Sequence, residues 1–287
     1  IGTGYLMAKK GLVDEYTNGQ ISRMIVNVFN PFLILSSAFG SVGTIPVDIM
    51  LQIGLVAAGM FVFFILAGRI LTPFFDRDPN QRKIFQMMFV FSNLGFIGIP
   101  VINSILGAEY VVYVTGFLVV YNVVFYTYGL SIMDGKFPAA SLSVFVNPGS
   151  ICSVIAVVVI CMRIEVPEFI GTAVTYLGNA ASPLALVLVG FTLERSDLKR
   201  IFGEIRLYLF SAVKLLVLPL LMLPLLRMVT EDPAVVSVSM IMFGMPIGNM
   251  PLILGNERGI DGSTCSAAII LSTVLCVFTV PVLVMVI

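Results

Sequence analysis

The stretch SNLGFIGIP, residues 92–100, lies inside an apolar run that extends from residue 84 to residue 107. Such a run is long enough to cross the hydrocarbon core of a bilayer, which takes about 20 helical residues. Proline removes a backbone donor and clashes with the preceding turn, and glycine lowers helix propensity. Gly95, Gly98 and Pro100 therefore predict a membrane helix that splits into two halves near its middle.

The composition predicts that the whole chain is an all-α polytopic membrane protein. Of its 287 residues, 59% are hydrophobic and 11% are charged, a balance that no soluble core of this size requires. Apolar runs bounded by charged or turn residues predict ten transmembrane helices, of which the first is expected to be truncated. They cover residues 1–8, 21–39, 47–71, 84–107, 110–133, 146–164, 167–193, 207–229, 233–255 and 262–287.

The residue types exclude several classes of function. The chain has no histidine, which excludes histidine-based catalytic triads, metal sites and proton relays. Cys152, Cys161, Cys265 and Cys276 lie in apolar runs without CxxC spacing, and we interpret them as packing residues. Sixteen basic and sixteen acidic residues cancel, so nothing favours nucleic acid as a partner. We expect neither an enzyme nor a bound cofactor or metal.

The basic residues predict how the chain is oriented in the membrane. Thirteen of the sixteen fall in loops that follow odd-numbered helices, whereas only Arg163 and Arg227 lie on the opposite side. Because cytoplasmic loops carry the excess of lysine and arginine, we expect a multi-pass plasma membrane protein with both termini outside the cytoplasm. Lys214, inside the eighth helix, either extends its side chain to the interface or attracts an entering anion.

Two pairs of similar segments predict an internal repeat. NVFNPFLIL at residues 27–35 matches NAASPLALV at 179–187 with an offset of 152, and NLGFIGIP at 93–100 matches GMPIGNMP at 244–251 with an offset of 151. The repeated units, residues 1–133 and 146–287, would hold five helices each. Because five is an odd number, the second copy would enter the membrane upside down, which is the inverted-repeat design of secondary transporters.

The second repeat carries its own interruption, because Pro246, Gly248 and Pro251 fall near the centre of the ninth helix. Backbone groups freed in hydrocarbon are costly, so such breaks are expected where something polar binds. Each half-helix that begins at a break directs unpaired N–H groups and the positive end of its dipole toward the middle of the membrane, which favours a carboxylate. Asn93 and Asn249 either donate to that carboxylate or only cap the half-helices.

Four segments resemble the auxin efflux carrier family of the bile/arsenite/riboflavin transporter superfamily. They are SNLGFIGIP at 92–100, NPGS at 147–150, GNAASPLALVLVGFTLE at 178–194 and GMPIGNMPLILGNERG at 244–259. The resemblance covers nearly the whole chain and is closest to the compact bacterial members. It implies a scaffold from residues 1–39 and 146–193, a mobile transport domain from 47–133 and 207–287, and an elevator-type shift of the substrate. It also implies a homodimer formed through the scaffold.

The resemblance also implies roles for individual residues. Asn93 matches an asparagine that contacts the substrate carboxylate in the plant PIN branch, and Pro246 matches the proline where helices four and nine cross. A proline precedes that asparagine in the PIN pattern, whereas this chain has Ser92. The break in the fourth helix is therefore expected to rest on Gly95, Gly98 and Pro100.

Together these features predict a secondary transporter that exports small organic anions, such as malonate-like dicarboxylates or auxin-like acids, by an elevator-type mechanism. The expected partners are that anion and the lipid bilayer. Lys214, Asn27, Asn30 and Asn122 are candidates for an electrostatic or scaffold contribution to the site. The alternatives are a sodium-coupled symporter of the bile-acid type and a membrane sensor that binds a lipid or sterol without transporting it.

Overall fold

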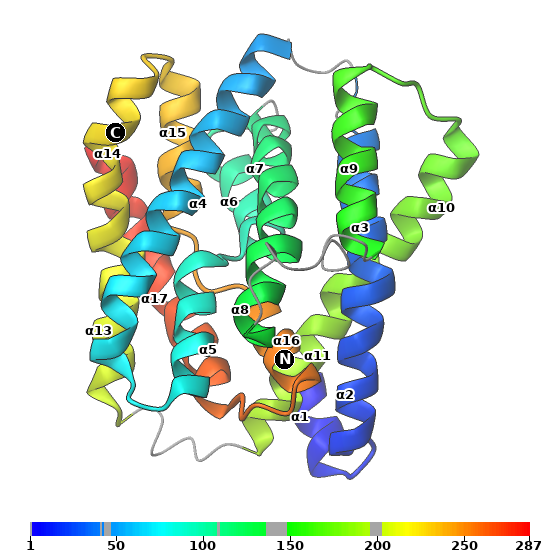
Figure 1. Cartoon of the computed structure of the whole chain (residues 1–287), viewed down its shortest axis with the longest axis vertical. Coiled ribbons are helices and arrows are strands. Elements are labelled where there is room, and N and C mark those ends of the chain that lie inside the picture. Colours follow the sequence, from blue (N-terminus) through cyan, green and yellow to red (C-terminus); the bar gives the residue numbers. More distant parts are fainter. Residues whose placement is uncertain (1, 41, 43–46, 108–109, 136–147, 196–202) are drawn as a thin grey trace. The chain divides into compact units, whose positions relative to one another are not determined.

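The computed structural model describes residues 2–40, 42, 47–107, 110–135, 148–195 and 203–287 (Figure 1). In these ranges the chain is helical and contains no strand. The prediction of an all-α membrane protein is confirmed, since five helical segments are long and apolar enough to cross a membrane: Glu15–Phe39, Asp48–Phe75, Tyr113–Asp134, Ile205–Val229 and Ser263–Val286. The count of ten and the inverted repeat stay predictions, and the predicted start of the second repeat lies outside the described residues.

The chain divides into two compact units. The first unit comprises residues 1–47, 118–197 and 249–263, and the second comprises residues 48–117, 198–248 and 264–287. Both segments of the predicted scaffold fall in the first unit. The division into a scaffold and a transport domain stays a prediction.

Helices that come from distant parts of the sequence build the first unit. α3 packs against α9 and α10, α1 packs against α11, and α2 packs against α16 (Figure 1). The elements are α1 (Gly2–Lys9), α2 (Glu15–Met24), η1 (Ile25–Phe29), α3 (Asn30–Phe39), η4 (Phe125–Gly129), α8 (Leu130–Asp134), α9 (Pro148–Cys161), α10 (Glu168–Asn179), α11 (Ala181–Glu194) and α16 (Met250–Glu257).

Small residues allow the helices of the first unit to approach closely. A Cβ atom on Gly4 of α1 would overlap the carbonyl oxygen of Val187 in α11, and one on Gly178 of α10 would lie 2.8 Å from Cα of Leu33 in α3. Backbone contact of this kind is the usual packing mode of membrane helices, where apolar burial gives no net driving force between helices. These two glycines therefore fix the spacing of their helix pairs.

Asp14 determines where α2 begins. Its side chain accepts a hydrogen bond from the backbone N–H of Thr17 at 2.8 Å, which is the N-cap arrangement that satisfies an orphan donor of the first turn. The interaction with Thr17 lowers the pKa of the Asp14 carboxyl. The cap therefore holds the first turn of α2 in place at neutral pH.

The second unit is built around a long helical hairpin. Gln86 in α5 donates to the carbonyl of Ile65 in α4 at 3.0 Å. Asp78 and Asp232 cap α5 and α15, and proline follows each of them at the first helical position. The elements are α4 (Val47–Phe75), α5 (Pro79–Val90), η2 (Leu94–Gly98), α6 (Ile99–Ile105), α7 (Val111–Val124, which continues into the first unit), α13 (Ile205–Ala212), η7 (Val213–Val217), α14 (Leu218–Val229), α15 (Pro233–Phe243) and α17 (Ser263–Val286).

A π-helical turn precedes a proline at three places in the chain. η1, η2 and η7 each end two residues before Pro31, Pro100 or Pro219. Proline cannot donate to the carbonyl four residues earlier, and a wider turn relieves the clash of its ring with that carbonyl. The chain remains helical through Pro31 and Pro219, so a proline alone does not break a helix here.

Candidate functional site

The fourth predicted helix is interrupted, but not at its glycines and proline. α5 ends at Val90, Phe91 leaves the helical conformation with φ −102° and ψ 90°, and η2 begins at Leu94. Gly95 and Gly98 lie inside η2, and Pro100 is the second residue of α6. The expectation that these three residues form the break itself is therefore wrong, because they begin the second half-helix, where proline is tolerated.

The ninth predicted helix is interrupted over a longer stretch. α15 ends at Phe243, and α16 begins at Met250. Pro246 and Gly248 lie in the interruption, as the sequence predicted, whereas Pro251 occupies the first turn of α16. The second half-helix again begins with a proline.

The two interruptions pair with each other inside the second unit. Ser92 and Ile247 form an antiparallel bridge. The Asn93 N–H donates to the carbonyl of Pro246 at 2.7 Å, and the Gly248 N–H donates to the carbonyl of Phe91 at 2.9 Å. We call residues 91–93 and 246–248 the paired break.

This pairing changes how the freed backbone groups are used. The sequence predicted that they would face a ligand, yet Asn93 and Gly248 donate within the paired break, and the Ile247 N–H donates to the Ser272 hydroxyl of α17 at 3.2 Å. The Leu94 N–H donates to the Ser92 carbonyl at 3.0 Å, and the first hydrogen bond inside η2 runs from Gly98 to the Asn93 carbonyl at 3.1 Å. The donors that a ligand could use are therefore the N–H groups of η2 between Leu94 and Gly98.

Polar side chains at the breaks are buried. Ser92 is 2% exposed, and its hydroxyl has no hydrogen-bond partner among the described residues, while Asn93 is 6% exposed. Asn249 directly follows Gly248 in the chain and precedes α16 of the first unit. It is 3% exposed, and neither of its amide atoms has a partner among the described residues. Unsatisfied buried polar atoms are rare in native structures and call for an explanation.

An apolar cavity lies beside η2 in the second unit. It measures about 550 Å³, and its walls come from η2 and α6 on one side and from α17 on the other: Ile97, Val101, Ser104, Ile105, Thr273, Cys276, Val277, Val280 and Pro281. α17 thus contributes Ser272 to the paired break and the next residue, Thr273, to the cavity. Sequence analysis missed both residues, although two adjacent hydroxyls in the apolar run IILSTVLC were a usable signal.

Lys214 does not extend to the membrane interface. Its side chain is fully buried in η7, and its Nζ atom lies 3.8 Å from the centre of the Phe64 ring in α4. Among the described residues Nζ has no hydrogen-bond partner. The interpretation that the side chain reaches the interface is therefore wrong, because cation–π contact with Phe64 holds it in the interior.

The other three candidate asparagines donate hydrogen bonds within the first unit. Asn27 is exposed and donates to the carbonyl of Arg23 at 2.9 Å. Asn30 is buried and donates to the Tyr126 hydroxyl at 3.0 Å, which joins η4 to α3. Asn122 donates to the carbonyl of Leu118 in its own helix at 2.7 Å.

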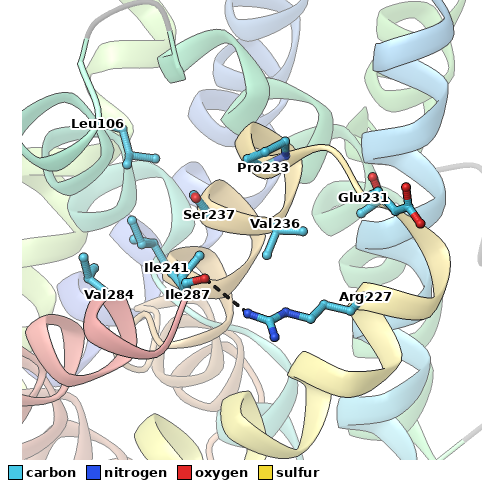
Figure 2. Close-up of a pocket in the computed structure, with 10 residues that line it drawn as sticks. Leu106, Arg227, Glu231, Pro233, Val236, Ser237, Ile241, Val284 and Ile287 are labelled. Carbon is cyan, nitrogen blue, oxygen red and sulfur yellow. Dashed lines mark hydrogen bonds between the residues drawn. The ribbon is translucent and has the colours of Figure 1, made fainter.

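A second cavity of the second unit measures about 580 Å³ (Figure 2). Its lining is mostly apolar and includes Leu106 and Ile241. Arg227 reaches across it toward Ile287 and donates to that residue's carbonyl at 3.2 Å, while the Glu231 carboxylate points away from the guanidinium (Figure 2). An arginine beside apolar walls is suited to an anion that carries a hydrocarbon body.

Comparisons with known proteins agree with a membrane carrier. The sequence profile of a family described as "Membrane transport protein" matches residues 1–143 and 137–284. A protein of Methanothermobacter thermautotrophicus named "Uncharacterized transporter" is 24% identical over 294 residues, which cover 97% of this chain and 92% of that protein. A protein of Rhizobium meliloti named "Putative malonate transporter" is 33% identical over 120 residues, which cover 42% of this chain and 37% of that protein.

Proposed function

The chain belongs to the membrane transport protein family, and from this premise we propose that it is a secondary transporter of small organic anions whose carboxylate binds at the paired break. The observation that carries the proposal is the Ser92 hydroxyl, which is buried between α5 and η2 and has no partner in the part of the chain that the structure describes. Leaving such a group unsatisfied costs about 1–3 kcal/mol. A ligand that accepts its hydrogen bond removes that cost.

The position of this hydroxyl favours an anion. Ser92 lies two residues before η2, which continues into α6 as one helical segment from Leu94 to Ile105. The first turn of this segment presents backbone N–H groups and the positive end of the helix dipole. A carboxylate placed there would accept from these donors, from Ser92 and from the Asn93 amide.

The neighbouring cavities support an organic anion over an inorganic one. Ile97 of η2 and Val101 of α6 line the apolar cavity of about 550 Å³. The hydrocarbon body of a carboxylate bound at the start of η2 would lie in this cavity. At the other end of α6, the Arg227 cavity of about 580 Å³ offers a guanidinium beside apolar walls. A small organic acid fits both environments, and the similarity to a protein named as a malonate transporter fits this substrate class.

We further propose that transport is efflux by an elevator-type movement, in which the paired break carries the substrate. Its two hydrogen bonds, Asn93 to Pro246 and Gly248 to Phe91, tie both broken segments to each other. A substrate bound at this place would move together with both segments.

Flux measurements test the proposal. The purified protein is reconstituted in liposomes, and the efflux of radiolabelled malonate, propionate and indole-3-acetate is measured with and without sodium and a proton gradient. We expect efflux of at least one of these anions without sodium, and we expect Ser92→Ala and Asn93→Ala to lower it about tenfold, as the loss of one hydrogen bond to a charged group implies. Ser211→Ala in α13 serves as the matched control, because it removes another buried hydroxyl without a partner among the described residues.

Three results would contradict the proposal. Accumulation that requires sodium would indicate a symporter of the bile-acid type. Binding of an anion, lipid or sterol without any flux would indicate a sensor. Unchanged efflux in both the Ser92 and Asn93 variants would place the substrate elsewhere.

A further inference from the structure

A polar cavity lies entirely within the first unit and shares no residue with the paired break. It measures about 300 Å³ and lies where α2 begins, where α11 ends and where the loop after α16 turns. Its lining includes Glu15, Asn18, Phe191, Arg195, Asn256 and Asp261. The volume is at the lower limit of ligand sites, so only a small molecule fits.

Two asparagines of this cavity have unsatisfied amide atoms. Asn18 is 5% exposed, and its Oδ1 atom has no hydrogen-bond partner among the described residues. The Nδ2 atom of Asn256 is likewise buried without a described partner. One atom needs a donor and the other needs an acceptor. A single hydroxyl group can supply both, because it donates one hydrogen bond and accepts others.

Charged side chains of both signs line the same cavity from more exposed positions. Glu15 is the first residue of α2, three residues before Asn18 and thus on the same helical face. Asp261 accepts hydrogen bonds from the N–H and hydroxyl of Ser263 at 3.0 and 2.8 Å. The Arg195 guanidinium lies 5.4 Å from the centre of the Phe191 ring. The two carboxylates favour a cation, and the guanidinium favours a carboxylate.

We propose that this cavity binds a small zwitterion that carries a hydroxyl group, of the class represented by L-serine. The ammonium group is held by Glu15 and Asp261, the carboxylate by Arg195, and the hydroxyl group by Asn18 and Asn256. A simple organic anion is disfavoured, because the described lining of the cavity holds two carboxylates and one guanidinium. The proposal does not rest on transport, since it concerns other residues and another ligand class.

Binding of L-serine to the purified full chain tests this assignment. Isothermal titration in detergent or nanodiscs compares L-serine with L-alanine, which lacks the hydroxyl group, and with L-glycerate, which has a hydroxyl group in place of the ammonium group. We expect L-serine to bind, and each analogue to bind about tenfold more weakly for the loss of one polar contact.

Matched variants separate the site from the rest of the fold. Asn18→Leu and Asn256→Leu should each weaken L-serine binding about tenfold without lowering the melting temperature, because they remove buried unsatisfied atoms at nearly constant volume. Arg195→Gln should weaken binding of L-serine about tenfold. Asn27→Leu, an exposed position of the helical run that begins with α2, should change nothing.

Three results would overturn the proposal. L-glycerate binding as tightly as L-serine would make the cavity an anion site. Failure of all three compounds to bind at millimolar concentration would leave it a solvent cavity. L-serine binding that is equally tight in both leucine variants would locate the ligand elsewhere. None of these results depends on whether organic anions are transported.

Discussion

Gly248→Ala should disturb the paired break, whereas Gly98→Ala should not. A Cβ atom on Gly248 would lie 3.0 Å from the Ser92 carbonyl oxygen and 3.1 Å from the Phe91 carbonyl oxygen. Both neighbours are backbone atoms, and the Phe91 oxygen already accepts from Gly248 at 2.9 Å. The added methyl group therefore pushes against the hydrogen bonds that join the two interruptions, and no side chain can turn aside to make room.

A Cβ atom at Gly98 would instead contact a flexible side chain. There the new Cβ atom would lie 2.9 Å from the terminal methyl carbon of Met242, and the methionine side chain can rotate away. Alanine also gains up to about 1 kcal/mol of helix propensity over glycine. We therefore expect Gly248→Ala to cost about 1–3 kcal/mol of stability, as overpacking does, and Gly98→Ala to leave stability nearly unchanged.

Two measurements check this difference. The melting temperature of each purified variant in detergent reports stability, and the efflux of labelled anion from liposomes reports transport. Gly248→Ala should melt several degrees below the unsubstituted protein and transport more slowly, because the Ser92 hydroxyl and Asn93 amide move with the displaced backbone. The reasoning is refuted if Gly98→Ala costs as much stability as Gly248→Ala, or if Gly248→Ala behaves like the unsubstituted protein.

Three more substitutions test other parts of the structure. Gly178→Ala should destabilise the protein by about 1–3 kcal/mol, because the added Cβ atom would lie 2.8 Å from the backbone of α3. Gly171→Ala, in the same helix, should be neutral or stabilising, because nothing lies within 4 Å of its Cβ position. Equal melting temperatures of the two variants would contradict this expectation. Lys214→Met should raise the melting temperature, because replacing a buried charge by apolar contacts is often stabilising by about 1–4 kcal/mol. The same substitution should slow anion efflux. A lower melting temperature would refute the expected gain in stability. Tyr126→Phe should lower stability by about 1–3 kcal/mol, because the buried Asn30 amide loses its hydrogen-bond acceptor. A decrease of the melting temperature by less than one degree would show that this hydrogen bond does not stabilise the fold.

The sequence predicted that two helices are interrupted, but it did not predict where the first interruption begins. Glycine and proline mark a segment in which the helix is weak. The chain leaves the helix three residues before Leu94, at Phe91, because the backbone there finds partners at Pro246 and Gly248. Those partners are more than 150 positions away in the sequence, so helix propensity carries no information about them.

Lys214 illustrates a second limit of sequence analysis. Its spacing from the nearest loop is compatible with a side chain that extends to the interface. The outcome depends on Phe64, which belongs to another helix and lies under the ammonium group. The partner of the buried Asn30 was equally impossible to deduce from the sequence, because only the tertiary structure brings the Tyr126 hydroxyl to the Asn30 amide. Sequence thus identified the polar positions in apolar runs but could not assign their partners.

The pairing of the two interruptions also constrains how a transporter of this kind can move. A mechanism that separates the two broken segments to open a path would have to break the hydrogen bonds from Asn93 to Pro246 and from Gly248 to Phe91 in an apolar interior. Each unsatisfied group there would cost several kcal/mol unless water entered. A mechanism that keeps both segments together leaves these bonds intact, and the cost of movement then falls on contacts between side chains and lipid. The paired break therefore favours displacement of the site as one body, which is the elevator-type movement proposed above.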